Sequence, residues 1–347
     1  MSDADVATRA PESDFDAEGP TMDSVPLEEP TAAPSQTPEQ PQISDHCTTD
    51  RPLPPSSSKP IGDLDPIGGI PCYVSKPSSY PSEPSRLLLL LTGGTGLLST
   101  NNQLQADAWA QQGYVVVMPD QFSGDPAPSA ANTATSLSAT TEGTVGSEAG
   151  AQPEQHTPSI IERVKLGLAE GTKSFMLDMW LARHTPATVE PILQKVLAGC
   201  KEQYADAVAN GDGIFGVGYC FGAKYILRLC GDLQSGSGAG EEEKGEIQHG
   251  PALKAGAVAH GTLVTKEDIE AVEKPIWLAC CRDDPVFPDS IVMAGRESFK
   301  RKGVKHGLQY YDSPHGFAVV GDYEDESIQK DQKDAFEAMS GFLQQQQ

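Results

Sequence analysis

The chain has 347 residues, of which 38% are hydrophobic, 34 are glycine and 28 are proline. This mixture indicates an ordinary globular domain extended by low-complexity sequence. The formal net charge is −24 at pH 7, and residues 1–50 supply −11 of it, because they hold twelve acidic residues and one arginine. Such an acidic balance argues against binding to nucleic acid or to anionic membranes, whose phosphates would repel it.

The sequence contains no run of 18 apolar residues, and its acidic first residues resemble neither a secretory signal nor a transit peptide. Seven cysteines form an odd set without a Cys-x-x-Cys pair, which indicates free thiols in a reducing compartment more than disulfides or a zinc site. These observations predict a cytoplasmic protein that contacts neither nucleic acid nor membrane, and we expect it to be a monomer.

Three tracts are too poor in large apolar residues to form a core. Residues 1–44 are acidic and rich in proline, and we expect them to be a disordered tail. Residues 125–158 and 234–250 are of low complexity, and we interpret them as insertions at the surface of one domain that spans 45–347.

Between these tracts, short apolar runs alternate with helical patterns. In chain order we expect strand 86–92, helix 101–112, strand 114–118, helix 186–210, strand 213–218, helix 221–230, strands 255–260 and 275–281, helix 289–302, strand 308–312 and a helix from about residue 327. Continuously apolar strands that alternate with helices predict an α/β fold, in which a mainly parallel central sheet carries helices on both faces. Ligands of such sheets bind at the carboxyl ends of the strands.

Residues 218–222 read Gly-Tyr-Cys-Phe-Gly and lie between a predicted strand and a predicted helix. Gly-x-Cys-x-Gly at this place is the cysteine version of a nucleophile elbow, a turn so tight that both flanking positions require glycine. The turn puts Cys220 at a helix N-terminus, which favours its thiolate, and directs the backbone N–H of Phe221 toward an oxyanion. The alternative is that Cys220 is a small buried apolar residue.

A thiol nucleophile needs a base, and the base needs an orienting group. Asp284 and His315 follow the last two predicted strands, so the chain order is nucleophile, acid, histidine, as in α/β-hydrolases. Asp283 is an alternative acid. His260 is the competing imidazole, although a role in lining the pocket suits it better.

The motifs HCTTDRPLPP, GIPCYVSKP, ADAWAQQGYVVVMPDQFSGDP, GYCFGAK, DDPVFP and HGFAVVGD resemble the dienelactone hydrolase family of cysteine α/β-hydrolases, most of all its fungal branch. The resemblance spans about residue 47 to the C-terminus, outside the two insertions. It implies the α/β-hydrolase fold and a catalytic triad of Cys220, Asp284 and His315, with Asp284 preferred over Asp283 by the D-x-x-F-P spacing. It also implies a carboxylic ester hydrolase of the carboxymethylenebutenolidase type that needs no metal or organic cofactor.

Two positions depart from the family pattern. Gly93 stands where the family usually has an acidic residue that helps to control the thiol proton, and Val320 stands where an arginine is common. By the same resemblance, the backbone N–H of Gly94 would be the second oxyanion donor. These departures concern the efficiency and the substrate more than the fold.

Two other functions remain open. The chain could be a non-catalytic α/β-hydrolase scaffold. The glycine turn after strand 86–92, with Asp120 at the end of the next strand, also resembles the nucleotide loop of short-chain dehydrogenases. Against the latter, Ser99 replaces the third glycine and no Tyr-x-x-x-Lys pair occurs in the sequence.

Removal of residues 1–40 is expected to leave the melting temperature nearly unchanged, because a segment without core residues contributes little to stability. Thermal unfolding of the full chain and of the shortened chain, compared in one buffer, tests this. A loss of many degrees would show that the segment packs on the domain.

Overall fold

The computed structural model describes residues 47–54, 59–129, 174–232 and 250–346. The predicted tail (1–44) lies outside these residues, as do most of the predicted insertions at 125–158 and 234–250. Among the helices of the described ranges, none combines the length and the apolar character needed to span a bilayer.

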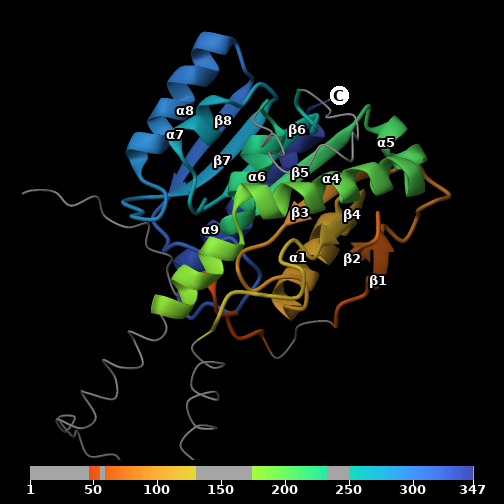
Figure 1. Cartoon of the computed structure of the whole chain (residues 1–347), viewed down its shortest axis with the longest axis horizontal. Helices are drawn as coiled ribbons and strands as arrows, with labels where there is room; N and C mark the ends of the chain where they lie inside the picture. The colour runs from red at the N-terminus through yellow and green to blue at the C-terminus, as the bar shows by residue number, and fades with distance from the viewer. Residues whose placement is uncertain (1–46, 55–58, 130–173, 233–249, 347) are drawn as a thin grey trace, which may run out of the picture. The chain divides into compact units, whose positions relative to one another are not determined.

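Within the described ranges, eight strands form one sheet in the order β1-β2-β4-β3-β5-β6-β7-β8 (Figure 1). The strands are β1 (Asp63–Ile67), β2 (Ile70–Ser75), β3 (Arg86–Leu91), β4 (Tyr114–Pro119), β5 (Ile214–Tyr219), β6 (Ala255–Ala259), β7 (Ile276–Cys281) and β8 (His306–Tyr311). The pairs β1–β2 and β2–β4 are antiparallel, and every pair from β4 to β8 is parallel. The predicted mainly parallel sheet is confirmed.

Helices cover both faces of this sheet. They are α1 (Thr100–Gln111), α4 (Pro186–Gln203), α5 (Ala205–Asn210), α6 (Phe221–Leu229), α7 (Lys266–Glu270), α8 (Asp289–Lys302) and α9 (Glu326–Gln344), and residues 174–183 are helical as well. Alternate leucines of β3 enter two separate cores: Leu88 and Leu90 pack with α1 and α9, whereas Leu87, Leu89 and Leu91 pack with α4, α6 and α8. Burial on both faces explains why β3 is apolar at five successive positions.

The structure corrects the expected elements in two places. The helix predicted over 186–210 is two helices, α4 and α5, because Tyr204 between them leaves the helical region with φ −128° and ψ 41°. The hairpin of β1 and β2 was not predicted, although Gly68 and Gly69 in its turn have positive φ values, as a tight hairpin requires. β1 lies at the edge of the sheet and is mostly exposed, so it lacks the apolar run that marks the other strands.

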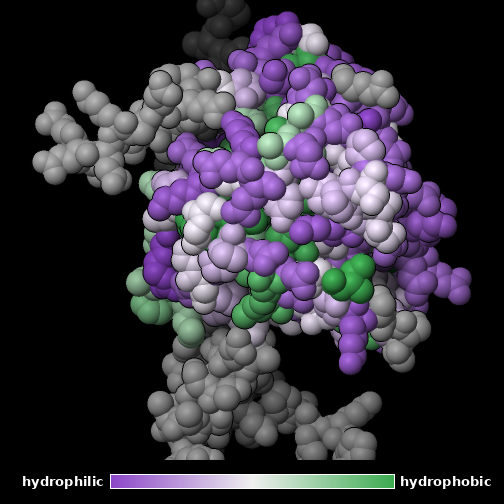
Figure 2. Space-filling view, turned by 90° about the vertical axis from the view of Figure 1, so that its right-hand side faces the viewer, coloured by the Kyte–Doolittle hydropathy of each residue, from purple (hydrophilic) through white to green (hydrophobic). Residues whose placement is uncertain are grey.

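Hydrophilic residues predominate on the coloured part of the face drawn in Figure 2, and hydrophobic residues lie there in small separate groups. Permanent interfaces between subunits usually need a broad apolar patch. This part of the surface offers no such patch, which agrees with the acidic composition of the chain.

The helix that follows the elbow, α6, is held by a partly buried ion cluster. Arg228 pairs with Glu190 of α4 and, at 2.7 Å, with Asp268 of α7, while Lys224 lies 3.3 Å from the same aspartate. The side chains of Arg228, Glu190 and Asp268 are 12%, 7% and 2% exposed. Removal of the arginine would take one cation from a cluster whose two carboxylates are largely buried.

We expect Arg228→Met to lower the free energy of unfolding by about 3 to 5 kcal/mol, because it breaks buried ion pairs from one side. The matched control is Arg183→Met, since Arg183 pairs with Asp125 at 2.8 Å while about half exposed, and should cost at most about 1 kcal/mol. Urea unfolding of both variants measures the difference. Equal losses in the free energy of unfolding of the two variants would contradict the inference that a buried ion cluster stabilises α6.

Candidate active site

The elbow has the geometry that the sequence predicts. Cys220 links β5 to α6 and has φ +51°, a conformation that residues with side chains rarely adopt. A Cβ atom at Gly222 would lie 2.3 Å from the carbonyl oxygen of Leu91, and one at Gly218 would lie 2.7 Å from the carbonyl oxygen of Gly222. Both positions therefore exclude side chains, and the resulting turn places the cysteine at the N-terminus of the helix.

The ends of β7 and β8 bring an acid and an imidazole together. His315 Nδ1 lies 2.7 Å from Asp284 Oδ2, and both residues are buried. The other carboxylate oxygen of Asp284 accepts a hydrogen bond from the backbone N–H of Val286 at 2.9 Å. Asp283 is exposed, so the structure separates the two candidate acids, which the sequence alone did not.

His260, the competing imidazole, lies beside this pair. It is fully buried at the end of β6, and its ring centroid is 5.0 Å from that of His315. Its side chain also lines the pocket described below. This position fits a residue that shapes the wall of the site.

A threonine that the sequence analysis did not single out connects the nucleophile candidate to the imidazole. The Oγ1 atom of Thr262 lies 3.1 Å from Cys220 Sγ and 3.1 Å from His315 Nε2. The residue is fully buried just after β6. Its place after a parallel strand is the only sequence signal that could have indicated it, because the carboxyl ends of such strands meet at one edge.

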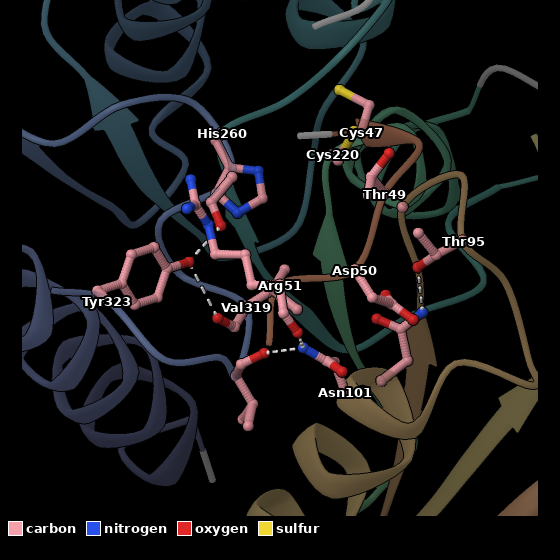
Figure 3. A pocket seen from close by; sticks show the side chains of 14 residues that line it. Cys47, Thr49, Asp50, Arg51, Thr95, Asn101, Cys220, His260, Val319 and Tyr323 are labelled. Carbon is pink, nitrogen blue, oxygen red and sulfur yellow. Dashed lines mark hydrogen bonds between the residues drawn. The ribbon is translucent and has the colours of Figure 1, made fainter. Parts of the chain in front are cut away.

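A second thiol completes the group. Cys47 Sγ lies 3.6 Å from Thr262 Oγ1, and the Sγ atoms of Cys47 and Cys220 and a ring nitrogen of His315 all lie within 4.8 Å of one another. Figure 3 shows both cysteine side chains at the same end of the pocket. Cys47 belongs to the segment before β1, 173 positions from Cys220 in the sequence, so no local motif links the two cysteines.

Burial and the second thiol set the pKa values of this group. Burial raises the pKa of the Cys220 thiol well above its usual range, and the neighbouring Cys47 adds to the effect. The hydrogen bond from Cys220 holds the pKa of Cys47 well below its usual range, although burial opposes it. Burial therefore opposes the thiolate that the helix N-terminus is expected to favour at Cys220.

The pKa of His315 is shifted in the opposite direction to that of an isolated buried histidine. Burial by itself lowers its pKa, but the hydrogen bonds to Asp284 and Cys47 outweigh this effect and raise the pKa to about 9. With a pKa of about 9 the imidazole is mainly protonated at neutral pH.

The pocket at this site has a volume of about 30 Å³, which accommodates only a couple of water molecules. Cys47, Cys220, Gly93 and Arg51 are among its lining residues. A Cβ atom at Gly93 would lie 3.3 Å from Cys220 Cβ, so any side chain there would crowd the nucleophile candidate. The guanidinium of Arg51, stacked 4.4 Å from the ring centroid of Tyr323, is a cation beside the pocket that sequence analysis missed.

Packing around Gly94 disfavours the dehydrogenase alternative. A Cβ atom at this residue would lie 2.6 Å from the carbonyl oxygen of Cys47 and 2.8 Å from Ala127 Cβ. The backbone N–H of Ala127 also donates to the carbonyl oxygen of Gly94 at 2.8 Å. A loop that binds a pyrophosphate needs open space over its glycines, and here other parts of the chain occupy that space.

Comparisons with known proteins agree with this arrangement. A sequence model described as the dienelactone hydrolase family matches residues 245–347. The hydrolase PyvD of Aspergillus violaceofuscus is 28% identical over 261 residues, which cover 74% of this chain and 79% of that protein. A protein of Gibberella moniliformis named dienlactone hydrolase 1 is 24% identical over 262 residues, which cover 75% of this chain and 78% of that protein.

Among solved structures, a putative dienelactone hydrolase from Klebsiella pneumoniae superposes with a TM-score of 0.52 at 15% identity. The superposition covers 82% of this chain and 98% of that chain. At 15% identity it is evidence of a shared fold only. The family match, the fungal relatives and the shared architecture confirm the resemblance: the chain is dienelactone hydrolase-like and has the α/β-hydrolase fold.

Proposed function

We propose that the protein hydrolyses a small carboxylic ester or lactone, with Cys220 as nucleophile, His315 as acid and base, and Asp284 as the group that orients His315. The observation that carries this proposal is the continuous series of contacts from Cys220 Sγ through Thr262 Oγ1 to His315 Nε2 and from His315 Nδ1 to Asp284. Each member lies at the carboxyl end of a strand or directly after one. The relatives called hydrolases support the same reaction class.

The first half-reaction forms a thioester. In this proposal the shared negative charge lies on Cys47 at rest, in agreement with the lowered pKa of Cys47 and the raised pKa of Cys220. Transfer of the Cys220 proton to Cys47 generates the nucleophile, whose sulfur then bonds to the carbonyl carbon. The backbone N–H groups of Phe221 and Gly94 would hold the oxyanion. When the intermediate collapses, the C–O bond breaks and His315 gives its proton to the leaving alkoxide, directly or through Thr262.

The second half-reaction returns the enzyme to its initial state. Neutral His315, held by Asp284, accepts a proton from water while the water oxygen bonds to the thioester carbon. The C–S bond then breaks, the acid product leaves, and Cys220 departs as a thiolate that takes back its proton from Cys47. His315 keeps the proton from water, so one water is consumed for each ester bond cleaved.

A non-catalytic scaffold is the second candidate. The small volume of the pocket, about 30 Å³, favours it, because an acyl group needs several times that space. Catalysis therefore requires the pocket walls to move when a substrate binds. Turnover of a small activated ester separates the two candidates.

Hydrolysis of p-nitrophenyl acetate by the full chain tests the proposal. The rate of hydrolysis by Cys220→Ala is expected to fall to that of the uncatalysed reaction. Thr262→Val, which keeps the shape but removes the hydroxyl, is expected to lose about 10- to 100-fold in kcat/KM, whereas the matched control Thr262→Ser keeps the hydroxyl and most of the activity. Undiminished turnover by Cys220→Ala would exclude this cysteine as the nucleophile.

The resting charge distribution predicts an order of alkylation. At pH 7 iodoacetamide is expected to modify Cys47 before Cys220, because the thiolate is the reactive form and resides on Cys47. In Cys47→Ser, Cys220 should react faster than it does in the original protein, since the neighbouring negative charge is gone. Cys72→Ser serves as the control, because burial raises the pKa of Cys72 to about 12 and its loss should change neither rate. Peptide mapping that finds Cys220 modified first in the original protein would contradict the assignment.

A further inference from the structure

We infer that Cys47, Cys220 and His315 form a binding site for Zn²⁺, and that the bound metal inhibits the enzyme. The inhibitory part of this inference rests on the proposed function, because it requires that Cys220 and His315 perform the hydrolysis. The binding part rests only on the arrangement of donor atoms. The metal is an inhibitor here and takes no part in catalysis.

The donor atoms lie near enough to one another for small side-chain movements to form a tetrahedral zinc site. Zinc binds thiolate sulfur at about 2.3 Å and imidazole nitrogen at about 2.0 Å, so neighbouring ligand atoms in a tetrahedron lie about 3.3 to 3.8 Å apart. Here the two Sγ atoms and the ring nitrogen lie within 4.8 Å of one another. Thr262 Oγ1 lies 3.1, 3.6 and 3.1 Å from Cys220 Sγ, Cys47 Sγ and His315 Nε2. The hydroxyl, or a water, can therefore supply the fourth ligand after small side-chain rotations.

The chemistry of the donors selects for zinc over hard cations. Two thiolates and one imidazole are soft or borderline ligands, which suit Zn²⁺ and bind Mg²⁺ or Ca²⁺ poorly. Zinc binding to the resting protein releases two protons to the solvent, one from the Cys220 thiol and one from Nε2 of His315, and the two thiolate charges balance the charge of the metal. Burial of all three residues keeps competing water from the ligands.

The surroundings of the imidazole also match those of a metal ligand. Zinc-bound histidines usually donate their second ring N–H to a carboxylate, which fixes the ring and strengthens the metal bond. Asp284 Oδ2 lies 2.7 Å from His315 Nδ1, on the side of the ring away from the thiols. The nitrogen nearest the thiols, Nε2, is therefore the one available to a metal.

A metal ion can reach this group through the pocket. Cys47 and Cys220 both line it, as do the polar side chains of Asp50 and Thr49 (Figure 3). A pocket of about 30 Å³ that is small for a substrate is sufficient for an ion of zinc's size. Once bound, the metal would occupy both the nucleophile and the base.

The test uses the reduced, chelator-treated full chain with Co²⁺ as a spectroscopic substitute for Zn²⁺. We expect one Co²⁺ per chain, a thiolate-to-cobalt charge-transfer band in the near ultraviolet, and loss of this band when Zn²⁺ displaces the cobalt. Cys47→Ser should lower the affinity for both metals at least 10-fold. Cys220→Ser should roughly halve the intensity of the charge-transfer band. Cys72→Ser, which alters a buried cysteine outside the cluster, should leave binding and basal hydrolysis unchanged. Melting temperatures establish that each variant is folded.

Hydrolysis of p-nitrophenyl acetate by the original protein and by Cys72→Ser should fall in proportion to bound Zn²⁺ and recover with a chelator. Absence of the charge-transfer band, or equal Co²⁺ affinity of folded Cys47→Ser or Cys220→Ser and the original protein, would overturn the metal site. If the protein binds the metal but hydrolyses no ester, the result would support the metal site and contradict the proposed hydrolase function. Hydrolysis that persists with the metal fully bound would refute the inhibition.

Discussion

The close approach of α6 to β3 is the constraint on which the rest of the site depends. The backbone N–H of Gly222 donates to the carbonyl oxygen of Thr92 at 2.9 Å, and a side chain at residue 222 would collide with Leu91. This contact holds Cys220 at a positive φ between the two adjacent strands β3 and β5. The ion cluster around Arg228 secures the same helix from its other side, so α6 is held at both ends.

Within that frame, the hydroxyl of Thr262 connects groups that do not lie in one line. It contacts two thiols and an imidazole, and Thr262 is fully buried. In such a buried cluster the position of each proton affects the free energy strongly, because a buried charge is stable only beside a partner. Burial raises the pKa of Cys220, whereas hydrogen bonds outweigh the effect of burial at Cys47 and at His315.

This arrangement also explains why one group of side chains suits both proposals. A thiolate beside an imidazole can act as a nucleophile with a neighbouring acid and base. The same two side chains can also bind a metal ion. The carboxylate behind the imidazole orients it for either purpose. Gly93 adds no acidic side chain next to Cys220, whose thiol lies within 4.8 Å of Cys47 Sγ and of a ring nitrogen of His315.

The amino-acid sequence by itself determined the six parallel strands β3 to β8, most of the helices and the elbow, because each depends on a local pattern. Apolar runs such as residues 87–91 predict buried strands, and glycines at 218 and 222 predict the turn. Cys220, Asp284 and His315 could be named because parallel strands bring their carboxyl ends to one edge. Their catalytic roles stay a prediction.

Only the tertiary structure decided what surrounds the nucleophile candidate. Cys47 and Thr262, whose side chains meet 215 positions apart in the sequence, carry no motif that announces the contact. The burial of Asp284 and its contact with His315 depended on tertiary packing, and the break at Tyr204 depended on a backbone angle that the helical pattern does not encode. The pKa values of the two thiols followed from the same long-range packing, since burial and a neighbouring charge outweigh the helix terminus that the sequence makes visible.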